Sequence, residues 1–290
     1  TFALRARPMS GHPRSLLVPT LLTALALLSP TTATAKPKVD AARIDALLEH
    51  LATGKVALRD RAAQRLYLLG HPRGHAGVLA LAAHRDPRRR ARGVWALGVV
   101  RPKGARSLVT ARLRDKEPGV RRAALSALIS LRVARAHVQL RRALEDPAPS
   151  VRRRVLQLAL RLPRHRLALL RRALDAKQAA LRLLALRALD KLPKKEGLPL
   201  LRRTCRKGKP LLRLLAAKAL QRRGLRRGTL TLATLARSRV DKGLRLQAIA
   251  ALAASPDPIA SRALRGLLRS RDRQLRQAAA DALAQRRSRR

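Results

Sequence analysis

The feature that most constrains the fold is a repeat of about 31 residues that fills most of the chain. Its clearest copy, residues 107–131, reads as an apolar helix, a tight turn that carries Asp115 and Pro118, and a second apolar helix. One arginine, here called the anchor arginine, marks the second helix of each copy, at successive spacings of 31, 31, 31, 30, 31, 32 and 31 residues. The anchors are Arg59, Arg90, Arg121, Arg152, Arg182, Arg213, Arg245 and Arg276. A repeat this regular predicts one elongated array rather than separate globular domains.

Positions around each anchor recur with helical spacing. The third residue after it is small in nearly every copy and the seventh is Leu or Ala, which predicts one apolar stripe closely approached by a neighbouring helix. In four copies a proline lies three residues before the anchor, where it favours a helix start: Pro87, Pro118, Pro149 and Pro210. The first helices of the copies are predicted at 41–51, 78–83, 105–113, 137–144, 166–174, 198–205, 229–235 and 259–268.

These patterns predict an all-α fold, an α-solenoid of about eight helical hairpins that stack into a superhelix. Aromatic residues are only 1% of the chain, so its core must be built from Leu, Ala and Val. We expect the solenoid to span residues 36–287, followed by a basic tail at 288–290. Its two ends are expected to be polar on their outer sides, through Asp40, Asp45 and Glu49 at the start and Arg273, Gln277, Asp281, Gln285 and Arg286 at the end.

Residues 1–35 resemble a secretory signal peptide rather than a repeat. From Met9, a basic residue at Arg14 precedes an apolar run from residue 16 to 28 and an A-x-A site that ends at Ala35. The apolar run is shorter than the ~30 Å hydrocarbon core requires, so no stable transmembrane anchor is expected. This order of a basic residue, an apolar run and a cleavage site predicts a periplasmic or secreted protein that is cleaved after Ala35. The alternative is an amino-terminal leader on a cytoplasmic protein.

The chain is strongly basic, with a formal net charge of +51 from 67 basic and 16 acidic residues. Such a charge attracts polyanions such as nucleic acid, anionic lipid or acidic polysaccharide, with binding that weakens steeply in salt. The alternative is a composition bias that places arginine at every tolerated surface position.

The pattern Asp-x-x-Pro-x-Val-Arg-x-x-Ala-x-x-Ala-Leu at residues 115–128, nearly repeated at 146–159, resembles HEAT repeats, in particular the bacterial HEAT-like group named after phycobilisome bilin lyases. The resemblance covers about residues 40–287 and implies an armadillo/HEAT-like superhelix; such arrays serve as scaffolds, lyase subunits and DNA alkylation repeat glycosylases. It also implies a ladder of turn aspartates and anchor arginines between repeats. Asp115 with Arg121 and Asp146 with Arg152 fit that ladder, whereas the later anchors have their acid displaced or missing.

Two surfaces are candidates for binding. The first is the outward side of the second helices, which in such arrays lines the concave face, and Trp95 is the expected aromatic contact there. Its members are Trp95, Arg154, Gln157, Arg161, Arg187, Lys191, Lys218 and Arg222. The second is a basic edge formed by the turns between repeats: Arg101, Lys103, Arg132, Arg135, Arg164, Arg166, Lys194, Lys195, Arg226 and Arg227. The competing interpretation of both is a solvated surface without a ligand.

No catalytic or cofactor motif stands out. His71, His75 and His84 form the only histidine cluster, but Pro72 and Gly74 are expected to interrupt any helix there, so we predict a polar loop and no metal site. Cys205 is the single cysteine and reads as a buried, inert thiol.

The sequence therefore favours a non-enzymatic scaffold, without a cofactor, that binds an unknown protein partner. The alternative is a polyanion binder without sequence readout, because the chain offers almost no aromatic residues on which bases could stack. A third alternative is an enzyme of the alkylation repeat type.

Overall fold

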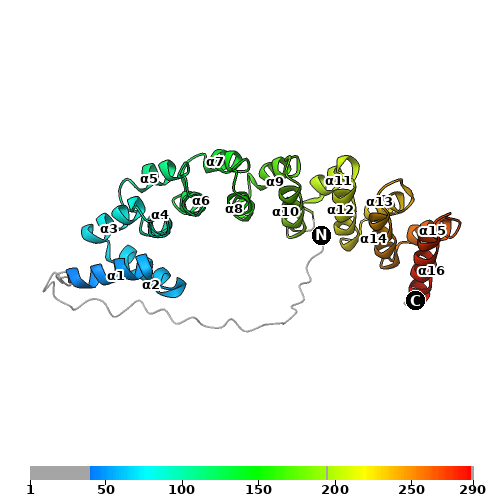
Figure 1. Cartoon of the computed structure of the whole chain (residues 1–290), viewed down its shortest axis with the longest axis horizontal. Helices are drawn as coiled ribbons and strands as arrows, with labels where there is room; N and C mark the ends of the chain where they lie inside the picture. The colour runs from blue at the N-terminus through cyan, green and yellow to red at the C-terminus, as the bar shows by residue number, and fades with distance from the viewer. Residues whose placement is uncertain (1–39, 194, 289–290) are drawn as a thin grey trace, which may run out of the picture. The chain divides into compact units, whose positions relative to one another are not determined.

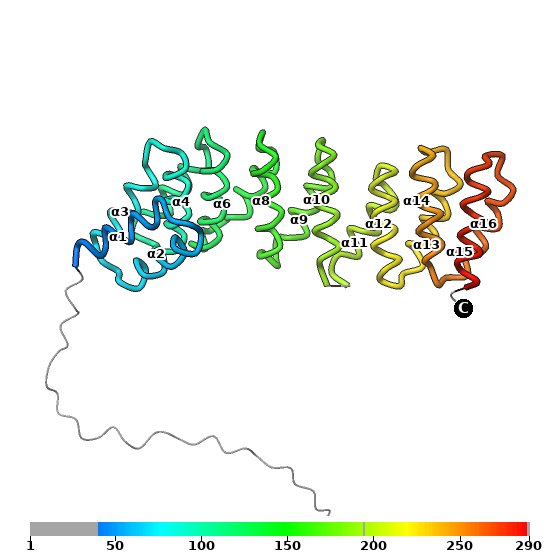
Figure 2. Tube along the Cα trace, turned by 60° about the horizontal axis from the view of Figure 1, so that its bottom comes forward, coloured from blue at the N-terminus to red at the C-terminus, as the bar shows by residue number. Residues whose placement is uncertain are grey.

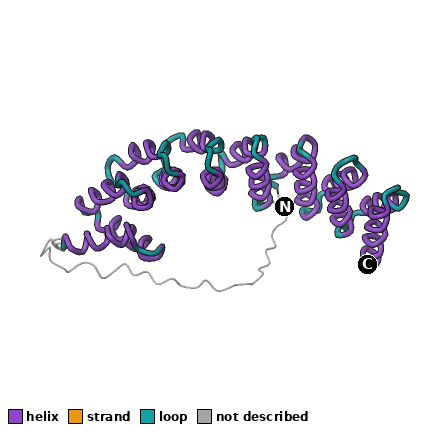
Figure 3. Tube along the Cα trace, in the orientation of Figure 1, coloured by secondary structure: helices purple, strands orange, loops and turns teal. Residues whose placement is uncertain are grey.

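The structure of the protein, a computed structural model, describes residues 40–193 and 195–288. Sixteen helices fill these residues, and no strand occurs among them (Figures 1 and 3). The helices are α1 (Ala41–Thr53), α2 (Val56–Leu69), α3 (Pro72–Ala83), α4 (Pro87–Val100), α5 (Ala105–Arg112), α6 (Pro118–Ser130), α7 (Ala136–Ala143), α8 (Pro149–Ala159), α9 (Arg166–Leu174), α10 (Ala179–Asp190), α11 (Leu198–Lys207), α12 (Pro210–Arg222), α13 (Arg226–Arg237), α14 (Lys242–Ala253), α15 (Pro258–Leu267) and α16 (Arg273–Arg287). The predicted signal peptide, Lys194 and the end of the basic tail lie outside the described residues.

Within residues 41–288 the helices pair as consecutive hairpins, which confirms the predicted all-α solenoid. Each odd-numbered helix packs against the even-numbered helix that follows it. The even-numbered helices also pack on one another in order, from α2 to α16, and form one row (Figure 2). The odd-numbered helices lie on the other side of this row. None of the helices in the described part is long and apolar enough to cross a membrane.

The predicted stripe on the second helices is the centre of the core. Every residue three after an anchor is buried, and so is every residue seven after one except Leu283, which is half-buried. At position 93 only glycine fits, because α4 packs directly against α3 and a Cβ there would lie 2.3 Å from the backbone nitrogen of Ala82. Small side chains at this position therefore set the spacing of the helices.

The predicted helix starts are confirmed at four prolines. Pro87, Pro118, Pro149 and Pro210 are the first residues of α4, α6, α8 and α12, where their missing N–H groups leave no helical hydrogen bond unmade. Asp86 adds a cap, since its carboxylate accepts hydrogen bonds from the backbone N–H groups of Arg88 and Arg89.

Two local predictions are wrong. Pro72 and Gly74 do not interrupt a helix: α3 begins at Pro72, and the Nδ1 of His71 accepts a hydrogen bond from the backbone N–H of Arg73. Arg286 does not face outward at the end of the array. It is only 8% exposed, and its guanidinium donates hydrogen bonds to the carbonyl oxygens of Leu252 and Asp257, because α16 packs back on α14 and α15.

Candidate functional site: a basic groove on the even-numbered helices

A groove of about 440 Å³ runs across four successive even-numbered helices, α2, α4, α6 and α8. Small residues, among them Ala91, Gly119 and Ala123, open it between the longer side chains. Its lining comprises Arg59, Ala91, Arg92, Trp95, Gly119, Arg122, Ala123, Ser126, Ser150, Arg153, Arg154 and Gln157. The groove exists because the same turn of each repeat faces the same side, so equivalent residues line up across the row.

Trp95 supplies the aromatic surface of the groove. It is half-buried, and the guanidinium carbon of Arg59 lies 4.8 Å from the centre of its ring. This cation–π contact orients the anchor arginine of the first repeat towards the groove, while the Nη2 of Arg59 lies 3.4 Å from the carboxylate of Asp60.

Arg154 is held in place at the other end of the groove. Its Nε donates to the hydroxyl of Ser126 at 2.9 Å, and its Nη1 donates to the amide oxygen of Gln157 at 3.2 Å. Burial, followed by repulsion from Arg161 and Arg122, lowers the pKa of the Arg154 guanidinium. An arginine keeps its charge at neutral pH even so, and an incoming anion would relieve this repulsion.

The electrostatic character of the groove follows from its lining. It contains five arginines, and none of the described residues that line it is acidic. A concave surface with one sign of charge concentrates the field, so this surface is suited to an acidic partner.

The structure brings together only part of the first predicted surface. Trp95, Arg154 and Gln157 line the groove, but the other five predicted residues do not. Arg161 and Lys191 lie beyond the ends of α8 and α10, Arg187 and Lys218 lie on α10 and α12, and Arg222 forms an ion pair with Asp190.

Sequence reasoning missed four arginines of the groove. Arg122 and Arg153 directly follow their anchors, and Arg92 lies two residues after one. Arg59 is one of the anchors and is not among the residues predicted for the concave surface. The signal that could have found them is a small residue next to the arginine or about one helical turn before it, such as Ala91, Gly119 and Ala123, which leaves room beside the arginines.

The anchor arginines are chiefly structural. In five repeats the Nη1 of the anchor donates hydrogen bonds to the backbone carbonyls six and five residues before it, at the turn inside the hairpin. These five are Arg90, Arg121, Arg152, Arg182 and Arg276. Helix ends and turns leave carbonyls without partners, and these guanidinium groups satisfy them.

The predicted ladder exists, but its pairing is shifted by one repeat. Arg121 binds the carboxylate of Asp146 through Nε at 2.8 Å and Nη2 at 2.9 Å, rather than that of Asp115. Asp115 is bound in the same way by Arg90, at 2.8 and 3.1 Å. Arg152 reaches only the backbone carbonyls of Asp146 and Pro147. The anchor reaches forward because the aspartate of the following repeat lies directly over it in the stack.

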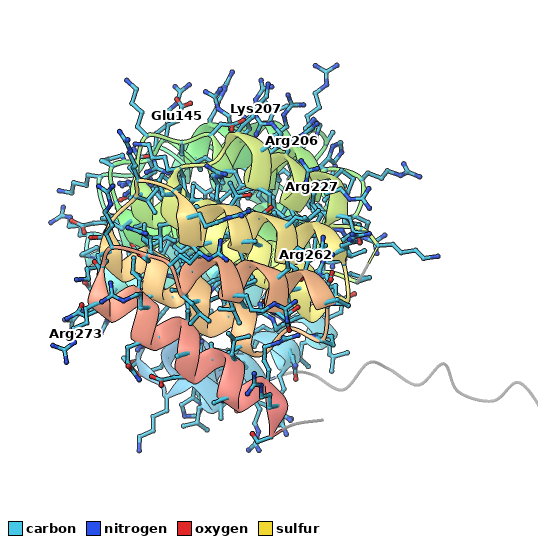
Figure 4. The ribbon with its side chains drawn as sticks, turned by 90° about the vertical axis from the view of Figure 1, so that its right-hand side faces the viewer. Glu145, Arg206, Lys207, Arg227, Arg262 and Arg273 are labelled. Carbon is cyan, nitrogen blue, oxygen red and sulfur yellow. The ribbon has the colours of Figure 1, made fainter. Side chains whose placement is uncertain are left out.

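The basic edge is exposed and locally strained. All of its described members are exposed except Arg166, which is half-buried and paired with Glu196. Arg101, Arg132 and Arg135 have φ angles of 56°, 50° and 57°, a left-handed conformation that normally favours glycine. Figure 4 shows that basic side chains outside this edge, such as Arg206 and Arg273, also project from the array. Positive charge is therefore spread over several faces.

Within the described residues no group of three or more His, Cys, Asp or Glu side chains could hold a metal ion. The Nδ1 of His84 accepts a hydrogen bond from the backbone N–H of Asp86, so this imidazole, like that of His71, stabilises a turn.

We expect Cys205 to resist alkylation in the folded protein. Burial raises the pKa of its thiol above the ordinary value, which lowers the fraction of reactive thiolate at neutral pH. Iodoacetamide at pH 7 should modify Cys205 at least about tenfold more slowly in the native chain than in denaturant, with mass spectrometry as the readout. Equal rates would show that the thiol is accessible.

Comparison with known proteins finds similarity to HEAT repeats over part of the chain. Residues 76–161 match the family model of HEAT repeats. Among solved structures, human deoxyhypusine hydroxylase is 22% identical, with 85% of this chain and 96% of that chain covered and a TM-score of 0.35. The Escherichia coli protein YibA is 18% identical, with 83% and 92% covered and a TM-score of 0.48. The CpcE–CpcF complex of phycocyanin lyase from Nostoc sp. PCC7120 is 18% identical, with 90% and 99% covered and a TM-score of 0.37. No curated protein matches the sequence.

Proposed function

We propose that this chain, a HEAT-like repeat protein, is a non-enzymatic scaffold that holds an acidic segment of a partner protein in the groove of α2, α4, α6 and α8. The observation that carries the proposal is the set of five arginines around Trp95 with no acidic side chain among the described lining residues. Arginine and tryptophan are the residues that most often dominate binding energy at protein interfaces.

A matched pair of charge reversals tests the groove. Arg153→Glu changes an exposed arginine inside it, and Arg171→Glu changes an exposed arginine on the odd-numbered helix α9. Proteins captured from the native cell envelope are compared in about 0.5 M salt, where the Debye length is only ~4 Å and diffuse attraction is weak.

We expect wild type and Arg171→Glu to capture the same polypeptide. Arg153→Glu should bind it at least about tenfold more weakly, because a charge-assisted hydrogen bond is replaced by repulsion. Trp95→Ala should weaken the same complex without altering net charge. Equal binding by wild type, Arg153→Glu and Arg171→Glu would contradict a role for the groove.

The alternative function is binding of a polyanion by the charge of the whole surface, which is favoured by basic side chains on several faces. In that case affinity for heparin or DNA falls steeply with salt, and Arg153→Glu and Arg171→Glu weaken it equally.

We also propose that the protein is exported, on the evidence of the residue order from Met9 to Ala35. Amino-terminal sequencing of the native protein should begin at Lys36, and an intact leader in the cytoplasm would contradict export.

A further inference from the structure

The ladder between neighbouring repeats lacks its carboxylate after Arg121, and among the described residues Arg182 is the anchor whose Nε is buried there without an acceptor. Arg182 on α10 donates its Nη1 to the carbonyls of Ala176 and Lys177 at 2.8 and 2.6 Å, as Arg90 does to the carbonyls of His84 and Arg85. In Arg90 and Arg121 the Nε–H then binds an aspartate of the next repeat. In Arg182 the Nε is buried and has no acceptor among the described residues.

The sequence register explains why the acceptor is missing. The ladder aspartate lies six residues before the next anchor, as Asp115 does before Arg121 and Asp146 before Arg152. Six residues before Arg213, the anchor that follows Arg182, the chain has Lys207. A positive charge therefore stands where the first repeats of the ladder carry a negative one.

A cavity of about 210 Å³ occupies this place between α9, α10, α11 and α12. Arg182, Arg203, Lys207 and Lys209 line it, together with one acid, Asp175, which is already bound by Arg203 at 2.8 Å. Leu174 and Leu212 form part of its wall. Four cations against one paired carboxylate leave the cavity with a net positive charge.

We propose that this cavity is a binding site for a carboxylate that comes from outside the chain. Two other repeats of the same chain show how a carboxylate would bind. Arg90 and Arg121 each bind both oxygens of one carboxylate through Nε and Nη2, while Nη1 donates to backbone carbonyls of the turn. The incoming carboxylate takes the place of the aspartate on Arg182, and Lys207 and Lys209 add charge around it (Figure 4 labels Lys207). The site lies outside the groove of α2 to α8 and does not depend on the function proposed for it.

The test compares heat denaturation of the full chain in sodium acetate and in sodium chloride of equal ionic strength. A ligand that binds only the folded state raises its melting temperature by mass action. At about ten times the Kd for acetate we expect a rise of roughly 3–5 °C over chloride for wild type.

Two variants with the same change in charge identify the site. Lys207→Glu supplies a carboxylate from within the chain, so it should melt above wild type in chloride and lose the extra stabilisation by acetate. Lys103→Glu, at an exposed turn far along the chain, should respond to acetate as wild type does. An equal response of wild type, Lys207→Glu and Lys103→Glu would overturn the proposal. It would also be overturned if wild type responded neither to acetate nor to the hexaglutamate peptide described next.

The carboxylate could belong to a small molecule or to an acidic side chain of another polypeptide. The same comparison with a hexaglutamate peptide distinguishes these two sources. If hexaglutamate stabilises wild type at carboxylate concentrations where acetate does not, the site takes an acidic side chain of a polypeptide; if acetate is as effective, it takes a small carboxylate. In either case the effect must disappear in Lys207→Glu and persist in Lys103→Glu. Should Lys207→Glu fail to fold, Lys207→Ala, which leaves the arginine in place, must weaken the response of the melting temperature to acetate.

Discussion

Replacing Asp115 by alanine is expected to lower the free energy of unfolding by about 3–5 kcal/mol, the usual effect of removing one partner of a buried ion pair. The side chains of Arg90 and Asp115 are only 9% and 5% exposed. Without the carboxylate, the guanidinium of Arg90 stays buried and unpaired in a chain of net charge +51, and the backbone N–H of Glu117 loses its acceptor as well. Urea denaturation followed by circular dichroism measures the loss.

The matched control is Glu145→Ala. Glu145 also pairs with an arginine of a neighbouring repeat, Arg172, but the two side chains are 68% and 60% exposed. Exposed pairs contribute at most about 1 kcal/mol. If Asp115→Ala and Glu145→Ala destabilise the protein equally, burial does not set the strength of these pairs.

The effect of Asp115→Ala should also depend on pH. Burial raises the pKa of the Asp115 carboxyl, but its hydrogen bonds with Arg90 and with the backbone of Glu117 outweigh burial and hold the pKa below the ordinary value of 3.8. A carboxyl with a depressed pKa stabilises the fold above its unfolded-state pKa, and this contribution disappears as the pH falls through the folded-state pKa. The difference between wild type and Asp115→Ala should therefore be constant near neutral pH and shrink below about pH 4.

Gly93→Val is expected to lower the free energy of unfolding by about 3 kcal/mol or more. This is the upper end of the usual cost of inserting an extra side chain into a packed core. A Cβ at residue 93 would lie 2.3 Å from the nitrogen of Ala82 and 2.4 Å from the carbonyl carbon of Leu81. Both are backbone atoms, so α3 and α4 must move apart and no side-chain rotation can relieve the contact. The measurement is again chemical denaturation.

Gly119→Ala is the control for helix propensity. Gly119 lies in the first turn of α6, and a Cβ there would meet nothing within 4 Å. Alanine should be neutral or stabilise the protein by up to about 1 kcal/mol, because it restricts the unfolded chain and favours the helix. A loss of stability in Gly119→Ala comparable with that in Gly93→Val would contradict the proposed contact between α3 and α4.

The fold could be predicted from the sequence because a solenoid depends on local, repeated contacts. The anchor spacing located the second helices, and prolines such as Pro118 located their starts. The groove could be predicted only in part, since its lining comes from four stacked helices, and the sequence of one repeat does not show that Arg122 and Arg153 lie together in it. The partners of the anchors were wrong by one repeat for the same reason: Arg121 and Asp115 are close in sequence, but the rise of the array places Asp146 beside Arg121. The register of a stack is a property of packed surfaces, which the spacing of residues within one repeat does not reveal.

The uneven ladder has a mechanical consequence. The buried ion pairs Arg90–Asp115 and Arg121–Asp146 connect three consecutive hairpins, from α3 to α8. The ion pairs between later repeats, such as Arg222–Asp190 and Lys242–Asp272, are more exposed. Solenoids deform at the interfaces between repeats, because each repeat contacts only its neighbours. Under tension, therefore, the hairpins from α3 to α8 should behave as one stiff segment, and extension should begin at the interfaces outside it, where the ion pairs are exposed.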